Sequence, residues 1–177
     1  DASSTVNLDG KGFPAGYTSN GAGGVVFFGG DRSGGSHGGV GGGQDNGVGS
    51  SPAPYGSIPQ PTEPGSGTGS NGGNNGGGAI KITTNDLVMN GVLSSRGLSG
   101  TYAGAAGGSI WVTATGGVSG SGTIRVNGAN SNWTGNQNGA GAGGRIAFVY
   151  NSTLPGNNTI SLVFQAFGSF MSGNDIV

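Results

Sequence analysis

Alternating apolar and polar residues recur along this chain, and their clearest pattern is one motif that is written three times between residues 76 and 150. The three copies read Gly77-Gly78-Ala79-Ile80-Lys81-Ile82-Thr83, Gly107-Gly108-Ser109-Ile110-Trp111-Val112-Thr113 and Gly143-Gly144-Arg145-Ile146-Ala147-Phe148-Val149. Counted from positions 79, 109 and 145, the copies are 30 and 36 residues apart. Alternation with a period of two is typical of β-strands, and spacings of this size are typical of repeat proteins.

A second alternating run follows each copy of the motif, so each repeat is predicted to contain two strands and a glycine-rich return. The second runs lie at residues 92–95, 123–126 and 159–164. The segment Thr5-Val6-Asn7-Leu8-Asp9-Gly10 matches the second run as residues 123–128 write it. The chain is therefore expected to begin within a repeat, as a processed product or a piece of something longer would.

Stacking the three repeats would align equivalent side chains in columns, because side chains alternate between the two faces of a strand. The expected apolar columns are Ile80 with Ile110 and Ile146, and Ile82 with Val112 and Phe148; Lys81, Trp111 and Ala147 would share the opposite face. No helix is predicted, since no window combines helical periodicity with helix formers free of glycine.

These patterns predict an all-β fold, a glycine-rich parallel β-helix or β-solenoid with a long irregular Gly/Pro-rich insertion, in a single domain. Residues 1–30 would form a partial first coil, with a short buried strand at 25–28, and 79–158 the repeated coils. The insertion, residues 31–78, holds five of the seven prolines and favours extended backbone lying against the coils, anchored by Tyr55 and Ile58. The apolar terminal strand, 159–177, would close the end or pair with a neighbouring subunit.

Glycine supplies 45 of the 177 residues, and ordering so much glycine is entropically costly unless the missing side chains allow something in return. We expect close approach of backbones, in sharp corners or in polyglycine-type extended helices packed side by side with hydrogen bonds between them. The alternative is that the glycine runs are flexible linkers. The net charge of −1 and the clustering of apolar residues favour an ordered protein with a thin core.

Composition disfavours several classes of function. Charged residues make up 7% of the chain and form no basic stripe, which disfavours nucleic-acid binding. No apolar run approaches the roughly 18 residues of a membrane span. There is no cysteine, so disulfides, thiolate nucleophiles and cysteine zinc sites are excluded.

Two kinds of carbohydrate site are candidates. Asn132, Asn151 and Asn157 fit the N-glycosylation pattern and lie in or beside predicted turns. Trp111, Trp133 and Tyr102 are candidate glycan-contact aromatics, whereas Tyr150 is expected to cap the core.

No catalytic, cofactor or metal site is predicted, and the chain is expected not to be an enzyme. His37, the single histidine, has no acid or base partner nearby in sequence and is expected to be a polar loop residue. Lys81, Asp86, Arg125 and Arg145 are of the types that β-helix polysaccharide enzymes use, yet the sequence offers no natural carboxylate pair. The acidic residues are too scattered for a calcium repeat, and no Gly-Lys-Ser/Thr motif indicates a phosphate loop. A threonine face for binding ice is broken by Val149, which stands where Thr83 and Thr113 do.

The glycine-flanked motifs at residues 55–57, 76–82, 107–112 and 143–147 resemble glycine-rich repeat regions of very large secreted surface proteins of microbes. The resemblance implies an extracellular scaffold and carries no catalytic residues. We therefore expect an extracellular or cell-surface structural subunit of a fibre, sheath or appendage. Its expected partners are copies of itself or other surface proteins, and glycans. The alternatives are an adhesin or carbohydrate-binding module and, less favoured, a polysaccharide-active β-helix enzyme.

Overall fold

The computed structural model describes residues 2–16, 32–43, 51–69, 73–132, 139–151 and 159–169. Within these ranges there are short and medium strands and no helix. The strands are β1 (Thr5–Asn7), β2 (Ala79–Thr84), β3 (Leu87–Val88), β4 (Val92–Ser94), β5 (Ser109–Ala114), β6 (Val118–Gly120), β7 (Thr123–Arg125), β8 (Arg145–Tyr150), β9 (Thr159–Ile160) and β10 (Val163–Gln165).

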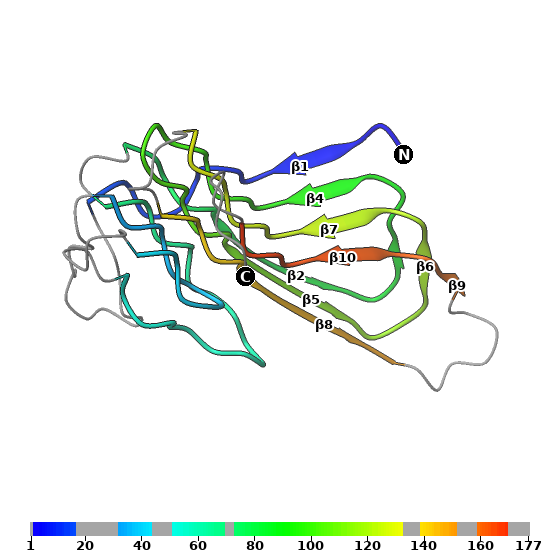
Figure 1. Ribbon diagram of the computed structural model, residues 1–177. Helices are drawn as coiled ribbons and strands as arrows, with labels where there is room; N and C mark the ends of the chain where they lie inside the picture. The colour runs from blue at the N-terminus through cyan, green and yellow to red at the C-terminus, as the bar shows by residue number, and fades with distance from the viewer. Residues whose placement is uncertain are drawn as a thin grey trace.

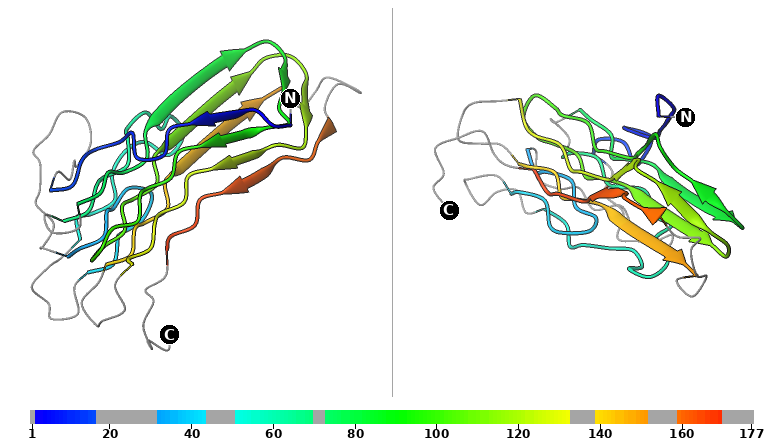
Figure 2. Two further views of the ribbon diagram at one scale, coloured as in Figure 1. Left: turned by 90° about the horizontal axis from the view of Figure 1, so that it is seen from above. Right: turned by 90° about the vertical axis from the view of Figure 1, so that its right-hand side faces the viewer.

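The strands form three separate sheets in which every pair is parallel. Their orders are β1-β4-β7-β10, β2-β5-β8 and β3-β6-β9, so each successive repeat adds one strand to each sheet. Figure 1 shows β1, β4, β7 and β10 as a stack, with β2, β5 and β8 forming a second layer below it. The sheets occupy one part of an elongated molecule, and extended segments without strands occupy the other (Figures 1 and 2).

The register predicted for the three motifs is confirmed. Ile80 pairs with Ile110 and Ile110 with Ile146, while Lys81, Trp111 and Ala147 follow one another in the adjacent row. Each repeat has one strand more than expected, because the two or three residues of β3, β6 and β9 are too few to leave a periodic pattern in the sequence.

The predicted fold class, an all-β parallel β-helix or β-solenoid with an irregular insertion, is wrong. The described strands form three small separate sheets, and most of the described chain lies outside any strand. Residues 32–43, 65–69 and 73–78 are not an irregular insertion either, because their backbone is hydrogen-bonded to glycine segments of the later repeats. The physical reason is that glycine allows backbones to pair with one another in more directions than the edges of a sheet provide.

The extended part, which we call the glycine bundle, consists of residues 32–43, 65–69, 73–78, 97–108, 127–132 and 139–144. Its segments hydrogen-bond to several neighbours at once. The consecutive N–H groups of residues 104–107 donate to the carbonyl oxygens of Gly139, Leu98, Ser66 and Ala142, in that order. A strand within a sheet has two neighbours, so this segment is packed inside a bundle. Of the alternatives for the glycine runs, side-by-side extended segments are therefore confirmed, and flexible linkers are wrong for these residues.

Gly104 and Gly107 show why the bundle needs glycine. A Cβ atom on Gly104 would collide with the carbonyl oxygen of Ala129, and one on Gly107 with that of Val126. In both cases the obstacle is backbone, which cannot move aside as a flexible side chain can. The close approach of backbones predicted from composition is thus present at these positions.

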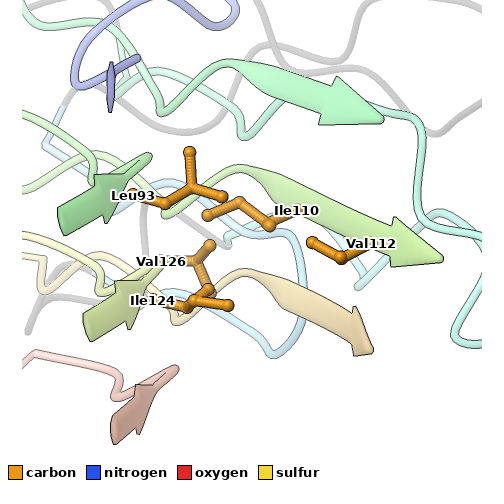
Figure 3. Close-up of a cluster of buried hydrophobic side chains, with 5 residues drawn as sticks. All are labelled: Leu93, Ile110, Val112, Ile124 and Val126. Carbon is orange, nitrogen blue, oxygen red and sulfur yellow. The ribbon is translucent and has the colours of Figure 1, made fainter. Parts of the chain in front are cut away.

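The hydrophobic core is small and lies between the β1-β4-β7-β10 sheet and the β2-β5-β8 sheet. It consists of Leu93 from β4, Ile110 and Val112 from β5, Ile124 from β7 and the adjacent Val126 (Figure 3). All except Leu93 are fully buried. The equivalent residues of the outer strands, including Ile80, Ile82, Ile146 and Phe148, are only partly buried, so burial decreases from the middle repeat towards both ends.

The two expected anchors of the proline-rich segment behave differently. Tyr55 is buried, as expected, whereas the side chain of Ile58 is 73% exposed, so its predicted anchoring role is wrong. The predicted strand at residues 25–28 lies outside the described residues. Phe164 and Phe167, in the apolar terminal segment, remain substantially exposed.

Candidate functional site

The segment from Tyr55 to Pro64 lies over the beginning of the β2-β5-β8 sheet and is held there by hydrogen bonds. The hydroxyl of Ser109 donates to the carbonyl oxygen of Glu63 at 2.6 Å, and the Tyr55 hydroxyl donates to that of Pro64 at 2.6 Å. Arg145 Nε donates to the Tyr55 carbonyl oxygen at 3.0 Å. Side chains of β5 and β8 therefore hold this segment in place.

His37 lies fully buried beneath the same segment. Its Nδ1 is 2.8 Å from the carbonyl oxygen of Gly107, and its ring stacks on Tyr55 with centroids 4.8 Å apart. Because a carbonyl oxygen only accepts, Nδ1 carries the proton, and Nε2 faces the Ser109 hydroxyl at 3.4 Å. The sequence predicts that His37 is a polar loop residue. It does lie in a loop, but its side chain is buried there. No local signal reveals this, since the contacts of His37 lie about 70 residues away.

The pKa of His37 is lowered to about 4, chiefly by burial and also by the nearby Arg145 guanidinium, against the opposing effects of the Gly107 carbonyl and Glu63. The imidazole is therefore neutral at pH 7. Burial likewise raises the pKa of the Tyr55 hydroxyl. Both groups are held in their uncharged forms, as buried groups without a full counter-charge are.

The pairing of Ser109 with His37 superficially resembles a nucleophile with its base, but the geometry does not support catalysis. The Ser109 hydroxyl already donates to the Glu63 carbonyl at 2.6 Å, which is shorter than its 3.4 Å separation from the imidazole. Both residues are fully buried, so a substrate has no access to them. The cluster is a structural clamp between the proline-rich segment and the sheet.

The four charged residues considered for polysaccharide chemistry do not come together. Lys81 lies on β2, Arg125 on β7 and Arg145 on β8, while Asp86 lies in the turn after β2. Asp86 accepts hydrogen bonds from Asn85 and from the backbone of Gly117, and Arg125 donates to Ser94. These contacts are those of turn and sheet residues. Among the described residues, no group of three or more His, Asp or Glu side chains is placed to hold a metal ion.

The candidate glycan-contact aromatics are already paired with cations. The Nζ of Lys81 lies 3.8 Å from the centroid of the Trp111 ring, and the guanidinium of Arg32 lies 4.6 Å from that of Tyr102. A sugar ring would have to displace a cation from the ring face that it covers. Trp133 lies outside the described residues.

The candidate glycosylation sites have different surroundings. Asn132 is exposed, and its backbone N–H donates to the carbonyl oxygen of Gly100. Asn151 is partly exposed and directly follows β8. Asn157 lies outside the described residues. The side chain of Asn132 is therefore the most accessible of those described.

The two ends of the sheets are the most distinctive surfaces of the described chain. The outer strands are β1, β2 and β3 at one end and β8, β9 and β10 at the other, and no described strand pairs with their outer edges. Apolar side chains are exposed at both ends: Val6 on β1 is 50% exposed, and Phe164 on β10 is 44% exposed. The sequence predicts an apolar terminal strand but not the matching exposure at the first end.

Comparisons of this chain with family models, with curated proteins and with solved structures found no match. In the part of the chain that the structure describes, there is no helix of the length and apolarity that a membrane crossing requires.

Proposed function

We propose that this protein is a structural subunit of an extracellular fibre, sheath or appendage, and that it assembles with copies of itself through the edges of its sheets. The observation that carries the proposal is the pair of open sheet ends with exposed apolar side chains. An unpaired edge presents free backbone donors and acceptors, and a further strand can add to it.

The sequences of the outer strands β8, β9 and β10 support the proposal, whereas β2 at the other end carries Lys81. Proteins that remain monomeric usually shield edge strands with lysine, proline, bulges or a covering loop. Strands β8, β9 and β10 contain neither lysine nor proline. Their sequences instead place valine, phenylalanine and tyrosine at the end of the stack. A repeat protein that works as a monomer generally needs a polar cap at this position.

The glycine bundle suits a mechanical role. Its backbone hydrogen bonds run between segments that are far apart in sequence. A pulling force on one segment is therefore transmitted to several others. Glycine faces also allow other chains to approach closely, which gives a second route for lateral packing. The extracellular location belongs to the proposal as well, and it rests on the resemblance to secreted surface repeats.

The proposal is tested by following the size of the purified chain as its concentration rises, by light scattering and electron microscopy, with the intact mass recorded. We expect filaments or a concentration-dependent series of oligomers. A monodisperse monomer of 16.9 kDa at all accessible concentrations would contradict the proposal.

A further inference from the structure

The two ends of the sheets differ in shape, although neither has a described strand beyond it. The first end, which we call the open end, contains an apolar cavity of about 200 Å³. Its lining includes Val6 from β1, Ile82 from β2, Leu87 from β3 and Leu93 from β4. The cavity lies where β1 extends its sheet by one strand beyond β4, while β2 and β3 have no described strand beyond them.

The last end, which we call the aromatic end, carries three rings in contact. Phe148 lies 5.4 Å from Phe164 in an edge-on arrangement and 6.0 Å from Tyr150, measured between ring centroids. Phe164 and Tyr150 remain 44% and 39% exposed. The rings are thus packed on the inner side and open on the outer side.

The cavity and the rings belong to the same columns of side chains. One column runs Val6, Leu93, Ile124, Phe164, and another runs Ile82, Val112, Phe148. Ile124 and Val112, in the middle, are fully buried. Each column therefore begins at a void and ends in a side chain larger than the buried ones beside it.

We propose that copies of this chain join head to tail, with the aromatic end of one copy seated in the open end of the next. This inference rests on the proposed function and specifies its contact. In this arrangement β10 adds beside β1, parallel to it, and Phe164 continues its column onto Val6. An apolar cavity of about 150 Å³ is enough to bind benzene. The cavity at the open end, of about 200 Å³, is therefore large enough for the phenyl ring of a phenylalanine from the aromatic end.

A second copy is the occupant because the contact continues the parallel pairing that already joins the strands of the β1-β4-β7-β10 sheet within the chain. The β2-β5-β8 and β3-β6-β9 sheets have three strands each, so one strand position between copies stays open in them, on the side where the cavity lies. No charged residue lines the cavity, and the one charged residue of β8, β9 and β10 is Arg145, whose Nε is bonded to the Tyr55 carbonyl.

A contact between two different surfaces leaves one of each free in every assembly, so it propagates into an open filament. This property gives a decisive test with two variants. Phe164→Asp disables the aromatic end and leaves the open end intact, and Val6→Asp does the reverse. Ile58→Asp, at an exposed position outside all of the end strands, is the matched control.

We expect wild type and Ile58→Asp to polymerise, and each end variant alone to remain monomeric with an unchanged circular dichroism spectrum. An equimolar mixture of the two end variants should form a 1:1 dimer and nothing larger, because one intact pair of ends remains. Sedimentation velocity measures this directly, and the dimer also shows that both variants are folded. Polymers formed by either end variant alone, or a mixture without dimer, would overturn the head-to-tail contact while leaving the proposed function standing. Failure of wild type to assemble would instead overturn the proposed function.

Discussion

At the scale of single residues, buried polar groups and closely packed glycines accompany the apolar side chains in holding this fold together. His37 is buried against Tyr55 and hydrogen-bonded to the backbone of Gly107, so it connects the proline-rich segment to the second of the three glycine-flanked motifs. At Gly104, the missing side chain is what allows two backbones to pack together. Both features make measurable predictions.

The neutral state of His37 predicts a loss of stability in acid. The pKa is about 4 in the folded chain and near its ordinary value of 6.5 in the unfolded chain, so the unfolded state binds a proton first as the pH falls. The stabilisation is complete above pH 6.5 and is lost progressively towards pH 4. We expect the free energy of unfolding, measured with urea, to be about 2–3 kcal/mol lower at pH 4.5 than at pH 7 because of this residue.

The control for this prediction is His37→Gln, which keeps a donor for the Gly107 carbonyl but does not titrate. This variant should be less stable at pH 7 and should lose most of the pH dependence between 6.5 and 4. An equally steep dependence in the variant and the wild type would show that other groups cause the acid sensitivity.

Gly104→Ala should be strongly destabilising. The added Cβ would meet the backbone of Ala129, and the neighbouring segment would have to shift and break its hydrogen bonds. We expect a loss of about 2–3 kcal/mol in the free energy of unfolding. Gly39→Ala is the matched control, because its Cβ would meet nothing closer than 4.0 Å. Similar costs for the two variants would contradict the role assigned to close backbone approach.

At the scale of elements, position in the stack decides how much a strand contributes. Strand β5 has neighbours on both sides and carries the fully buried Ile110, whereas Ile80 occupies the same column on the outer strand β2 and is only partly buried. The middle repeat should therefore hold most of the core energy.

Alanine substitutions along this column test that gradient. Ile110→Ala removes a fully buried side chain between two strands and should cost about 3–4 kcal/mol. Ile80→Ala should cost less than half as much in the monomer, because part of its surface is already in water. Chemical denaturation of both variants measures the difference, and equal costs would contradict a core centred on the middle repeat.

Some of these elements could be predicted from the sequence, and others could not. Strands β2, β5 and β8 and their register follow from an alternating motif that repeats three times, since period and spacing are local properties. The neighbours of each glycine segment and the burial of His37 depend on contacts between distant residues. Glycine runs look alike in sequence wherever they pack. The predicted fold class failed for this reason: composition predicts that glycine runs pack side by side, but it does not indicate which segments pair or that segments of residues 31–78 take part.

At the scale of the whole molecule, the two ends of the sheets differ. The open end contains an apolar cavity, and the aromatic end carries packed aromatic rings. The side chains of the end strands are those of a core that continues beyond one copy. In the proposed filament each copy is one segment, and the partly exposed side chains of the end strands become buried when further copies add.

The most direct test of this account is the axial rise per subunit in filaments of the wild-type chain, measured by electron microscopy with helical reconstruction. If β10 of one copy adds beside β1 of the next, each copy contributes four strands to that sheet. At about 4.8 Å per strand, the rise should be roughly 19 Å. We expect a rise near this value, with the aromatic end of each copy against the open end of the next. Filaments with a clearly different rise, or a chain that forms no filaments at any concentration, would contradict it.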